Sequence, residues 1–145
     1  MLHRVRRDLI RGDGYTLIEL LVVILVIGVL ASIALPVFLG QREQAQDAEA
    51  KSAAGNMAHQ IEVCATATGT YAGCEISVTS ATTGLPVGPG PGEVRVEGTP
   101  TETDYVVIAR SGANAGARTY TVARSGSSTV HSCAPSGGGC DGTSW

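Results

Sequence analysis

The feature that most constrains this chain is a run of twenty almost wholly apolar residues, 20–39, with the sequence LLVVILVIGVLASIALPVFL. Twenty helical residues rise about 30 Å, which matches the hydrocarbon thickness of a bilayer. Residues 1–14, ahead of the run, carry four arginines and two aspartates. A basic segment before an apolar run is typical of an export signal. The sequence therefore predicts a leader over 1–14, a membrane helix over 15–39 and an exported head over 40–145.

Residues 40–66 predict a different kind of helix, because they are rich in Ala, Gln and Glu, which favour helix. Apolar residues recur there at spacings of three or four and form a narrow stripe on a polar helix. The members of this stripe are Ala50, Ala54, Met57, Ile61 and Cys64. Together with the membrane run, the segment predicts one long helix from about Thr16 to Ala65, which Pro36 should bend.

The rest of the chain reads as loop and strand. Residues 67–92 predict an irregular connection, because Gly69 ends the helix and Pro and Gly crowd positions 85–92. Residues 93–133 predict a sheet of short antiparallel strands separated by turn-like segments. The strands are expected at 93–97, 104–110, 118–124 and 129–133. The expected fold class is α+β: a long N-terminal helix packed on a small antiparallel β-sheet.

Four cysteines follow the apolar run: Cys64, Cys74, Cys133 and Cys140. An even number on the exported side predicts disulfides, and four cysteines allow three pairings. We favour Cys64–Cys74 and Cys133–Cys140, because each closes a short local loop. The second pair would make a C-terminal cysteine loop over 133–140. The spacings do not match those of a zinc site, so no metal is expected.

Composition and motifs argue against several classes of function. The formal net charge of −3 offers no basic footprint, so direct nucleic-acid binding is not expected. The chain contains no G-x-S-x-G, P-loop or H-E-x-x-H pattern, so we do not expect an enzyme. His59 and His131 are interpreted as ordinary surface residues. Five charged residues are interpreted as a solvated helix face, with contacts between subunits as the alternative: Arg42, Glu43, Asp47, Glu49 and Lys51.

The most informative motif is GYTLIE at residues 14–19, directly before the apolar run. Here Glu19 places an ionisable carboxylate at the edge of a membrane segment. Burying such a group costs at least about 2.5–3.5 kcal/mol, so the carboxylate needs a cationic partner. Glu19 is therefore a candidate functional residue.

On these residues the sequence resembles the type IV pilin and pseudopilin family, whose prepilins carry a class III signal peptide. The resemblance rests on the basic leader ending at Gly14, the motif from Tyr15 to Glu19, and an apolar helix containing Gly28 and Pro36. It covers residues 1 to about 40. The chain departs from the family at Tyr15, where Phe is most frequent; both are aromatic.

The resemblance implies that a prepilin peptidase cleaves after Gly14 and N-methylates Tyr15. The new amine would be cationic, and Glu19 would be its partner, mainly on a neighbouring subunit. Gly28 and Pro36 flank a stretch that unwinds in assembled filaments of the family. Together with Ser32 they recur every fourth residue, and small residues at this spacing let helices approach closely.

Three functions are compatible with the sequence. The first is a structural subunit of a type IV pilus, anchored by one helix in the cytoplasmic membrane and its lipid before joining a surface filament. Its partners would be the peptidase, identical or related pilins, and an inner-membrane assembly platform with its ATPase; it needs no cofactor. The second is a pseudopilin of a type II secretion or DNA-uptake (competence) system. The third is a membrane-tethered extracellular binding module that does not polymerise.

Overall fold

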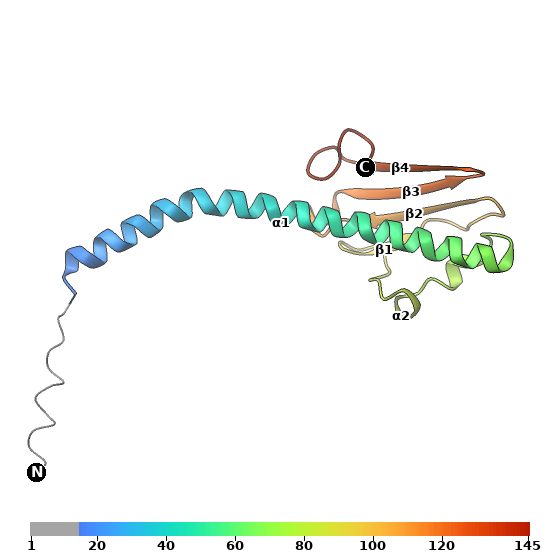
Figure 1. Ribbon diagram of the computed structural model, residues 1–145, viewed down its shortest axis with the longest axis horizontal. Coiled ribbons are helices and arrows are strands. Elements are labelled where there is room, and N and C mark those ends of the chain that lie inside the picture. Colours follow the sequence, from blue (N-terminus) through green and yellow to red (C-terminus); the bar gives the residue numbers. More distant parts are fainter. Residues whose placement is uncertain (1–14) are drawn as a thin grey trace, which may run out of the picture. The chain divides into compact units, whose positions relative to one another are not determined.

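The computed structural model describes residues 15–145, so the leader and its Gly14 lie outside the described residues. The chain divides into two compact units between Phe38 and Leu39, and each is described by itself. Figure 1 labels the helices and strands. In chain order the elements are α1 (Leu17–Thr68), η2 (Cys74–Ile76), α2 (Ser80–Thr83), β1 (Val94–Val96), β2 (Asp104–Arg110), η3 (Ala113–Gly116), β3 (Thr119–Ser125) and β4 (Ser128–Ala134).

Helix α1 is continuous over 52 residues and passes through Pro36 without ending. It stops at Gly69, whose φ of +80° is a left-handed conformation that glycine adopts without a Cβ penalty. The Gly69 N–H donates to the carbonyl of Ala65 at 2.8 Å, which satisfies one of the last free carbonyls of the helix. The helix thus extends three residues past the predicted end at Ala65.

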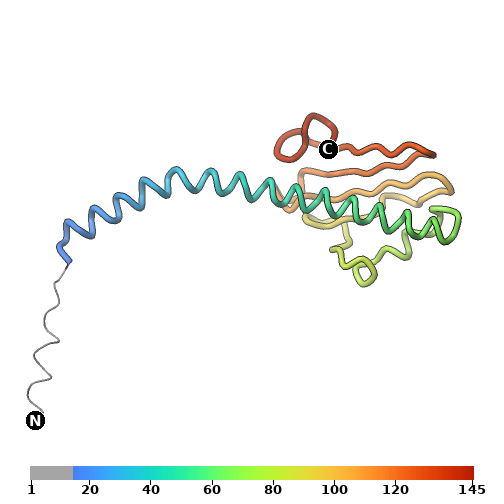
Figure 2. Tube along the Cα trace, in the orientation of Figure 1, coloured from blue at the N-terminus to red at the C-terminus, as the bar shows by residue number. Residues whose placement is uncertain are grey.

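The four strands form one antiparallel sheet in the order β1-β2-β3-β4, a meander whose neighbours in space are neighbours in sequence. Strand β2 has the predicted bounds, and its burial alternates strictly along the strand. This period of two marks a sheet with one face on the core. The trace in Figure 2 shows the head part of α1 running along the sheet. The α+β prediction, a long helix packed on a small antiparallel sheet, is confirmed.

The core lies between this face of the sheet and a stripe of α1. The buried apolar residues of the helix are four alanines and two larger side chains: Ala50, Ala53, Ala54, Met57, Ala58 and Ile61. The predicted stripe is therefore confirmed, with Cys64 packed at its margin. From the sheet come larger side chains, above all Tyr105 and Tyr120. Four alanines on the helix leave room for these tyrosines, because interiors fill space at the density of organic crystals.

Glu62 ties the end of α1 to the sheet and to the following loop. It accepts hydrogen bonds from the hydroxyls of Tyr71 at 2.8 Å and Tyr105 at 3.0 Å, and Arg124 lies 3.4 Å away. The two tyrosine rings meet edge to face with centroids 4.9 Å apart. Burial and the bond to Glu62 raise the pKa of Tyr105, so its hydroxyl stays protonated and donates.

The predicted loop 67–92 is more ordered than its composition indicates. It contains η2, which begins at Cys74, and the short helix α2. Helix α2 starts with a capping box between Thr79 and Thr82 and ends at Gly84, which has a φ of +68°. The sequence analysis missed both elements, because each is too short to show a hydrophobic period. They are held instead by caps and by the link of Cys74 to α1.

One prediction about the polar side of the helix is wrong. Asp47 was interpreted as part of a solvated face, but its exposed fraction is 0 %. It pairs with Arg118, which lies 71 positions later in the chain. Burial raises the pKa of Asp47, but the nearby Ser111 side chain, the hydrogen bond from the Gly139 N–H and the Arg118 charge outweigh this and lower the pKa below its usual range. The exposed residues Arg42, Glu43 and Glu49 do lie on a solvated face.

The stripe can be tested at Ile61, which is fully buried, against Val63, which is 50 % exposed on the same helix. We expect Ile61→Ala to lower the free energy of unfolding by about 2–4 kcal/mol, because it leaves a cavity. Val63→Ala should change it by less than about 0.5 kcal/mol. Urea unfolding of the full chain in mild detergent, followed by Trp145 fluorescence, measures both. Equal effects of the two substitutions would contradict the packing.

Candidate functional site

The start of α1 is closed by a reciprocal pair of side chains, Thr16 and Glu19. The Glu19 N–H donates to the Thr16 hydroxyl oxygen at 3.2 Å, and the Thr16 N–H donates to Glu19 Oε2 at 3.2 Å. The Thr16 hydroxyl is also 3.3 Å from the same carboxylate oxygen. This is a capping box, in which a threonine and a glutamate three residues later satisfy two orphan donors of a helix.

The capping box gives Glu19 a local role that the sequence analysis overlooked. The T-x-x-E spacing before an apolar run was the available signal. Glu19 also lies in the first turn, where an acidic side chain interacts favourably with the positive end of the helix dipole. The box holds the carboxylate beside the backbone of Thr16, one residue from Tyr15. Tyr15 itself is 80 % exposed.

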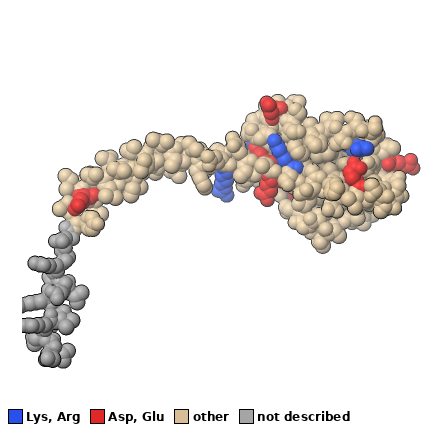
Figure 3. All heavy atoms as spheres, in the orientation of Figure 1, with Lys and Arg blue, Asp and Glu red and all other residues tan. Residues whose placement is uncertain are grey.

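Between its first turn and Leu39, α1 presents an apolar surface on all sides. Its Leu, Ile, Val and Phe side chains from Leu17 to Leu39 are exposed, and its most apolar 18 residues have a mean hydropathy of 3.0. Figure 3 shows the corresponding stretch without charged atoms on the visible face. A helix that is apolar all round needs lipid or other apolar helices around it. In the described part of the chain, α1 is long and apolar enough to span a membrane.

A shallow groove on this surface runs past the two small residues Gly28 and Ser32. Its other lining residues are Leu21, Ile24, Leu25 and Val29. The Ser32 hydroxyl donates to the Val29 carbonyl at 2.7 Å, so it is satisfied within the helix. Four residues later, Pro36 supplies no N–H, so the Ser32 carbonyl lacks its usual helical partner. The hydrogen-bond ladder of α1 is therefore weakest between Ser32 and Pro36.

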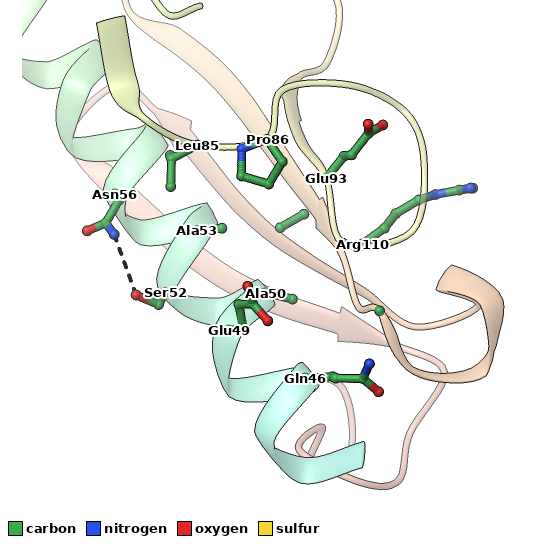
Figure 4. Close-up of a pocket in the computed structure, with 13 residues that line it drawn as sticks. Gln46, Glu49, Ala50, Ser52, Ala53, Asn56, Leu85, Pro86, Glu93 and Arg110 are labelled. Atoms are coloured by element: carbon green, nitrogen blue, oxygen red, sulfur yellow. Dashed lines mark hydrogen bonds between the residues drawn. The ribbon is translucent and has the colours of Figure 1, made fainter. Parts of the chain in front are cut away.

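The head contains a separate cavity of about 190 Å³ between α1 and the loop at 85–93 (Figure 4). Gln46, Glu49 and Asn56 line it from the helix side. From the other side comes Glu93, whose carboxylate accepts the Gly90 N–H at 2.6 Å and so closes its own loop. Arg110 lines the cavity as well, beside Glu93.

No group of three or more His, Cys, Asp or Glu side chains within residues 15–145 is placed to hold a metal ion. His59 is exposed on α1. His131 stacks on Trp145 with ring centroids 4.7 Å apart. Both histidines are exposed, as expected for ordinary surface residues.

The cysteines form two local disulfides. Cys64 is bonded to Cys74 and Cys133 to Cys140, with a Cα–Cα separation of 5.8 Å in each pair. These are the two pairings that the sequence favours. The first joins the end of α1 to η2, and the second closes a loop after β4. Both disulfides lie in the head, far in the sequence from the capping box at the start of α1.

The capping box can be tested by replacing Thr16. We expect Thr16→Ala to speed hydrogen exchange of the Glu19 amide about fivefold, because losing a helix cap costs about 1 kcal/mol. Thr16→Ser, which keeps the hydroxyl, should retain most of the protection. The rates are measured by NMR of the chain in detergent micelles. An unchanged Glu19 rate in Thr16→Ala would show that the hydroxyl does not protect this amide.

Comparison with known proteins matches residues 12–35 to the model of the prokaryotic N-terminal methylation motif. No curated protein and no solved structure matches the chain significantly. The matched segment contains the GYTLIE motif, the capping box and most of the apolar stretch of α1. The motif implies processing by a prepilin peptidase and assembly with pilin subunits, and the apolar helix is consistent with membrane anchoring before assembly. The chain thus carries the N-terminal methylation motif, the class III signal of type IV pilins, and this match supports a pilin-like or pseudopilin-like prepilin.

Proposed function

We propose that this chain is a structural subunit of a type IV pilus that polymerises through its N-terminal helix. The observation that carries the proposal is Glu19, a single carboxylate held at the start of an exposed apolar helix, three residues after Thr16. An acid in this position is costly in lipid unless a cation meets it. We also propose that the subunit is not an enzyme and needs no cofactor.

Processing would create the cation. Cleavage after Gly14 gives Tyr15 a free amine, and N-methylation keeps this amine basic. The amine of one subunit and the Glu19 carboxylate of its neighbour would then neutralise each other. Each ion is expensive to bury alone, and leaving one unpaired costs several kcal/mol. The pair would therefore select one axial register between adjacent helices, while apolar contacts supply most of the cohesion.

The middle of the helix would adapt during assembly. The Ser32 carbonyl already lacks a helical donor because of Pro36, so unwinding between Gly28 and Pro36 breaks fewer hydrogen bonds than elsewhere in α1. The small residues Gly28 and Ser32 line the groove described above, where a neighbouring helix could approach closely. We propose that this stretch is extended when the subunit leaves the membrane.

The proposal includes the cellular setting. The subunit would wait in the cytoplasmic membrane as a single-pass protein with its head outside. A membrane platform driven by an ATPase would then move it into a surface filament. The two disulfides favour an exposed fibre, because covalent links stabilise small domains outside the cell. The second candidate is a pseudopilin, which would use the same helix in a short periplasmic fibre; imaging cells for long surface fibres separates the two.

The cleavage site is tested by expressing the chain with and without a prepilin peptidase. We expect the co-expressed chain to begin at a methylated Tyr15 and the chain alone to keep residues 1–14. Mass spectrometry of the N-terminus reads both. A Gly14→Leu control should stay uncut, because a large residue does not fit a pocket for a small one. A chain that keeps its leader beside an active peptidase would support a tethered binding module instead.

The register role is tested with Glu19→Gln. Glutamine can still accept the Thr16 N–H in a capping box but carries no charge, so the substitution removes only the ion pair. We expect the variant to be inserted and cleaved normally and to give less than about a tenth of the wild-type filaments in electron micrographs, since a lost partner for a buried ion costs over 1.4 kcal/mol.

The matched control is Glu43→Gln, an exposed acid on the same helix, which should assemble normally. Filaments of Glu19→Gln in wild-type number would rule out the ion pair as the determinant of register. Loss of cleavage in this variant would move Glu19 from assembly to processing.

A further inference from the structure

The loop closed by Cys133 and Cys140 covers a buried ion pair. Asp47 of α1 is fully buried, and Arg118, directly before β3, is 8 % exposed. Arg118 Nη1 donates to Asp47 Oδ2, and the Gly139 N–H donates to the same oxygen at 2.9 Å. One carboxylate oxygen thus joins three segments that lie far apart in the sequence. Of these three segments, the loop with Gly139 comes last in the sequence.

The glycines of this loop are explained by how closely it approaches the pair. A Cβ on Gly138 would lie closer to Arg118 Nη1 and to Asp47 Oδ2 than real Cβ atoms come to other atoms. A Cβ on Gly139 would lie 3.0 Å from the Tyr120 hydroxyl. Gly138 also has a φ of +57°, a conformation that side chains disfavour. The run of three glycines at 137–139 lets backbone lie directly on the ion pair.

The two ends of the loop are anchored in the core. The cysteines Cys133 and Cys140 are both buried, and Gly137 and Cys140 exchange backbone hydrogen bonds at 2.9 and 3.0 Å. After the loop, the Thr143 carbonyl accepts the Cys133 N–H at 2.9 Å. The Trp145 ring also donates to the Ser132 carbonyl at 2.9 Å. The glycines over Asp47 thus lie in a loop whose two buried ends are joined by the Cys133–Cys140 disulfide.

We propose that the loop at 133–140 is a disulfide-dependent clasp that seals the Asp47–Arg118 pair from water, so that opening the disulfide and exposing the pair are coupled. Closing the bond converts two thiols into one disulfide and passes two electrons and two protons to a disulfide oxidant, which becomes a dithiol. Structural disulfides form and persist mainly in oxidising compartments. The head therefore completes its fold, with α1, β3 and the C-terminal segment locked together, after its cysteines leave the reducing cytoplasm.

The test measures how Asp47→Asn changes the equilibrium constant for unfolding of the full chain in detergent, in several variant backgrounds. Asparagine keeps the volume and can accept the Gly139 N–H, but it leaves the Arg118 charge unpaired. In the wild-type background we expect the equilibrium constant for unfolding to rise more than about a hundredfold, as for a broken buried pair. In Cys133→Ser/Cys140→Ser the same substitution should raise it less than about fivefold, as for an exposed pair.

Two controls separate the clasp from general weakening. Cys64→Ser/Cys74→Ser removes the other disulfide, and there Asp47→Asn should keep its large effect. Gly138→Ala keeps both disulfides but pushes the loop away, so it should reduce the effect as the loss of Cys133 and Cys140 does. Gly126→Ala is its match, because Gly126 has a φ of +56° and open space around it. It should leave the effect of Asp47→Asn unchanged.

The test works even if the Cys133→Ser/Cys140→Ser variant does not fold. In that case the effect of Asp47→Asn is compared between the Gly138→Ala and Gly126→Ala backgrounds. An equal effect of Asp47→Asn in the Gly138→Ala and Gly126→Ala backgrounds would overturn the clasp. A small effect in the wild-type background would overturn it as well, since the pair would then not depend on being sealed. The result is independent of filament formation, so it stands apart from the proposed function.

Discussion

Helix α1 has to satisfy two surroundings, an apolar one along its first part and the core of the head along its second. Within a bilayer a chain has to satisfy every backbone N–H and C=O internally, and an α-helix does this without partners. The apolar stretch of α1 meets that condition with side chains exposed all round. The same helix continues to Thr68, and in the head it offers only a narrow stripe to the sheet. The helix is therefore both the candidate anchor and one wall of the core.

The head compensates for a thin core with well-placed polar side chains. Aromatics make up only 4 % of the chain, yet Tyr71, Tyr105 and Tyr120 are all buried in the core. Two acids of α1 receive distant partners, Glu62 from the sheet and Asp47, about four turns earlier, from Arg118 directly before β3. Buried ion pairs add little net stability, because desolvation offsets their attraction. Their fixed partners instead favour one alignment of the helix against the sheet.

Local patterns predicted the parts of the fold that repeat with a regular period. The stripe on α1 and the strand β2 were both expected, because burial on one side imposes periods of 3.6 and 2. The short elements η2 and α2 were missed, because three or four residues cannot display a period. At the start of α1, the sequence analysis explained Glu19 by the free-energy cost of an acid in lipid. It therefore did not consider that Glu19 also caps the helix together with Thr16. A carboxylate can serve both purposes, since the cap uses one of its two oxygens.

Sequence patterns alone were enough to identify an apolar helix long enough for a membrane and the methylation motif at its start, and they favoured local pairing of the four cysteines. These conclusions rest on neighbours in the chain, whose chemistry can be read without coordinates. The burial of Asp47 and the reason for three glycines before Cys140 emerged only from the packing of the folded head. Asp47 finds Arg118 at 71 positions and Gly139 at 92 positions along the chain. No periodic pattern records such distant contacts, because they form only when the sheet closes against the helix.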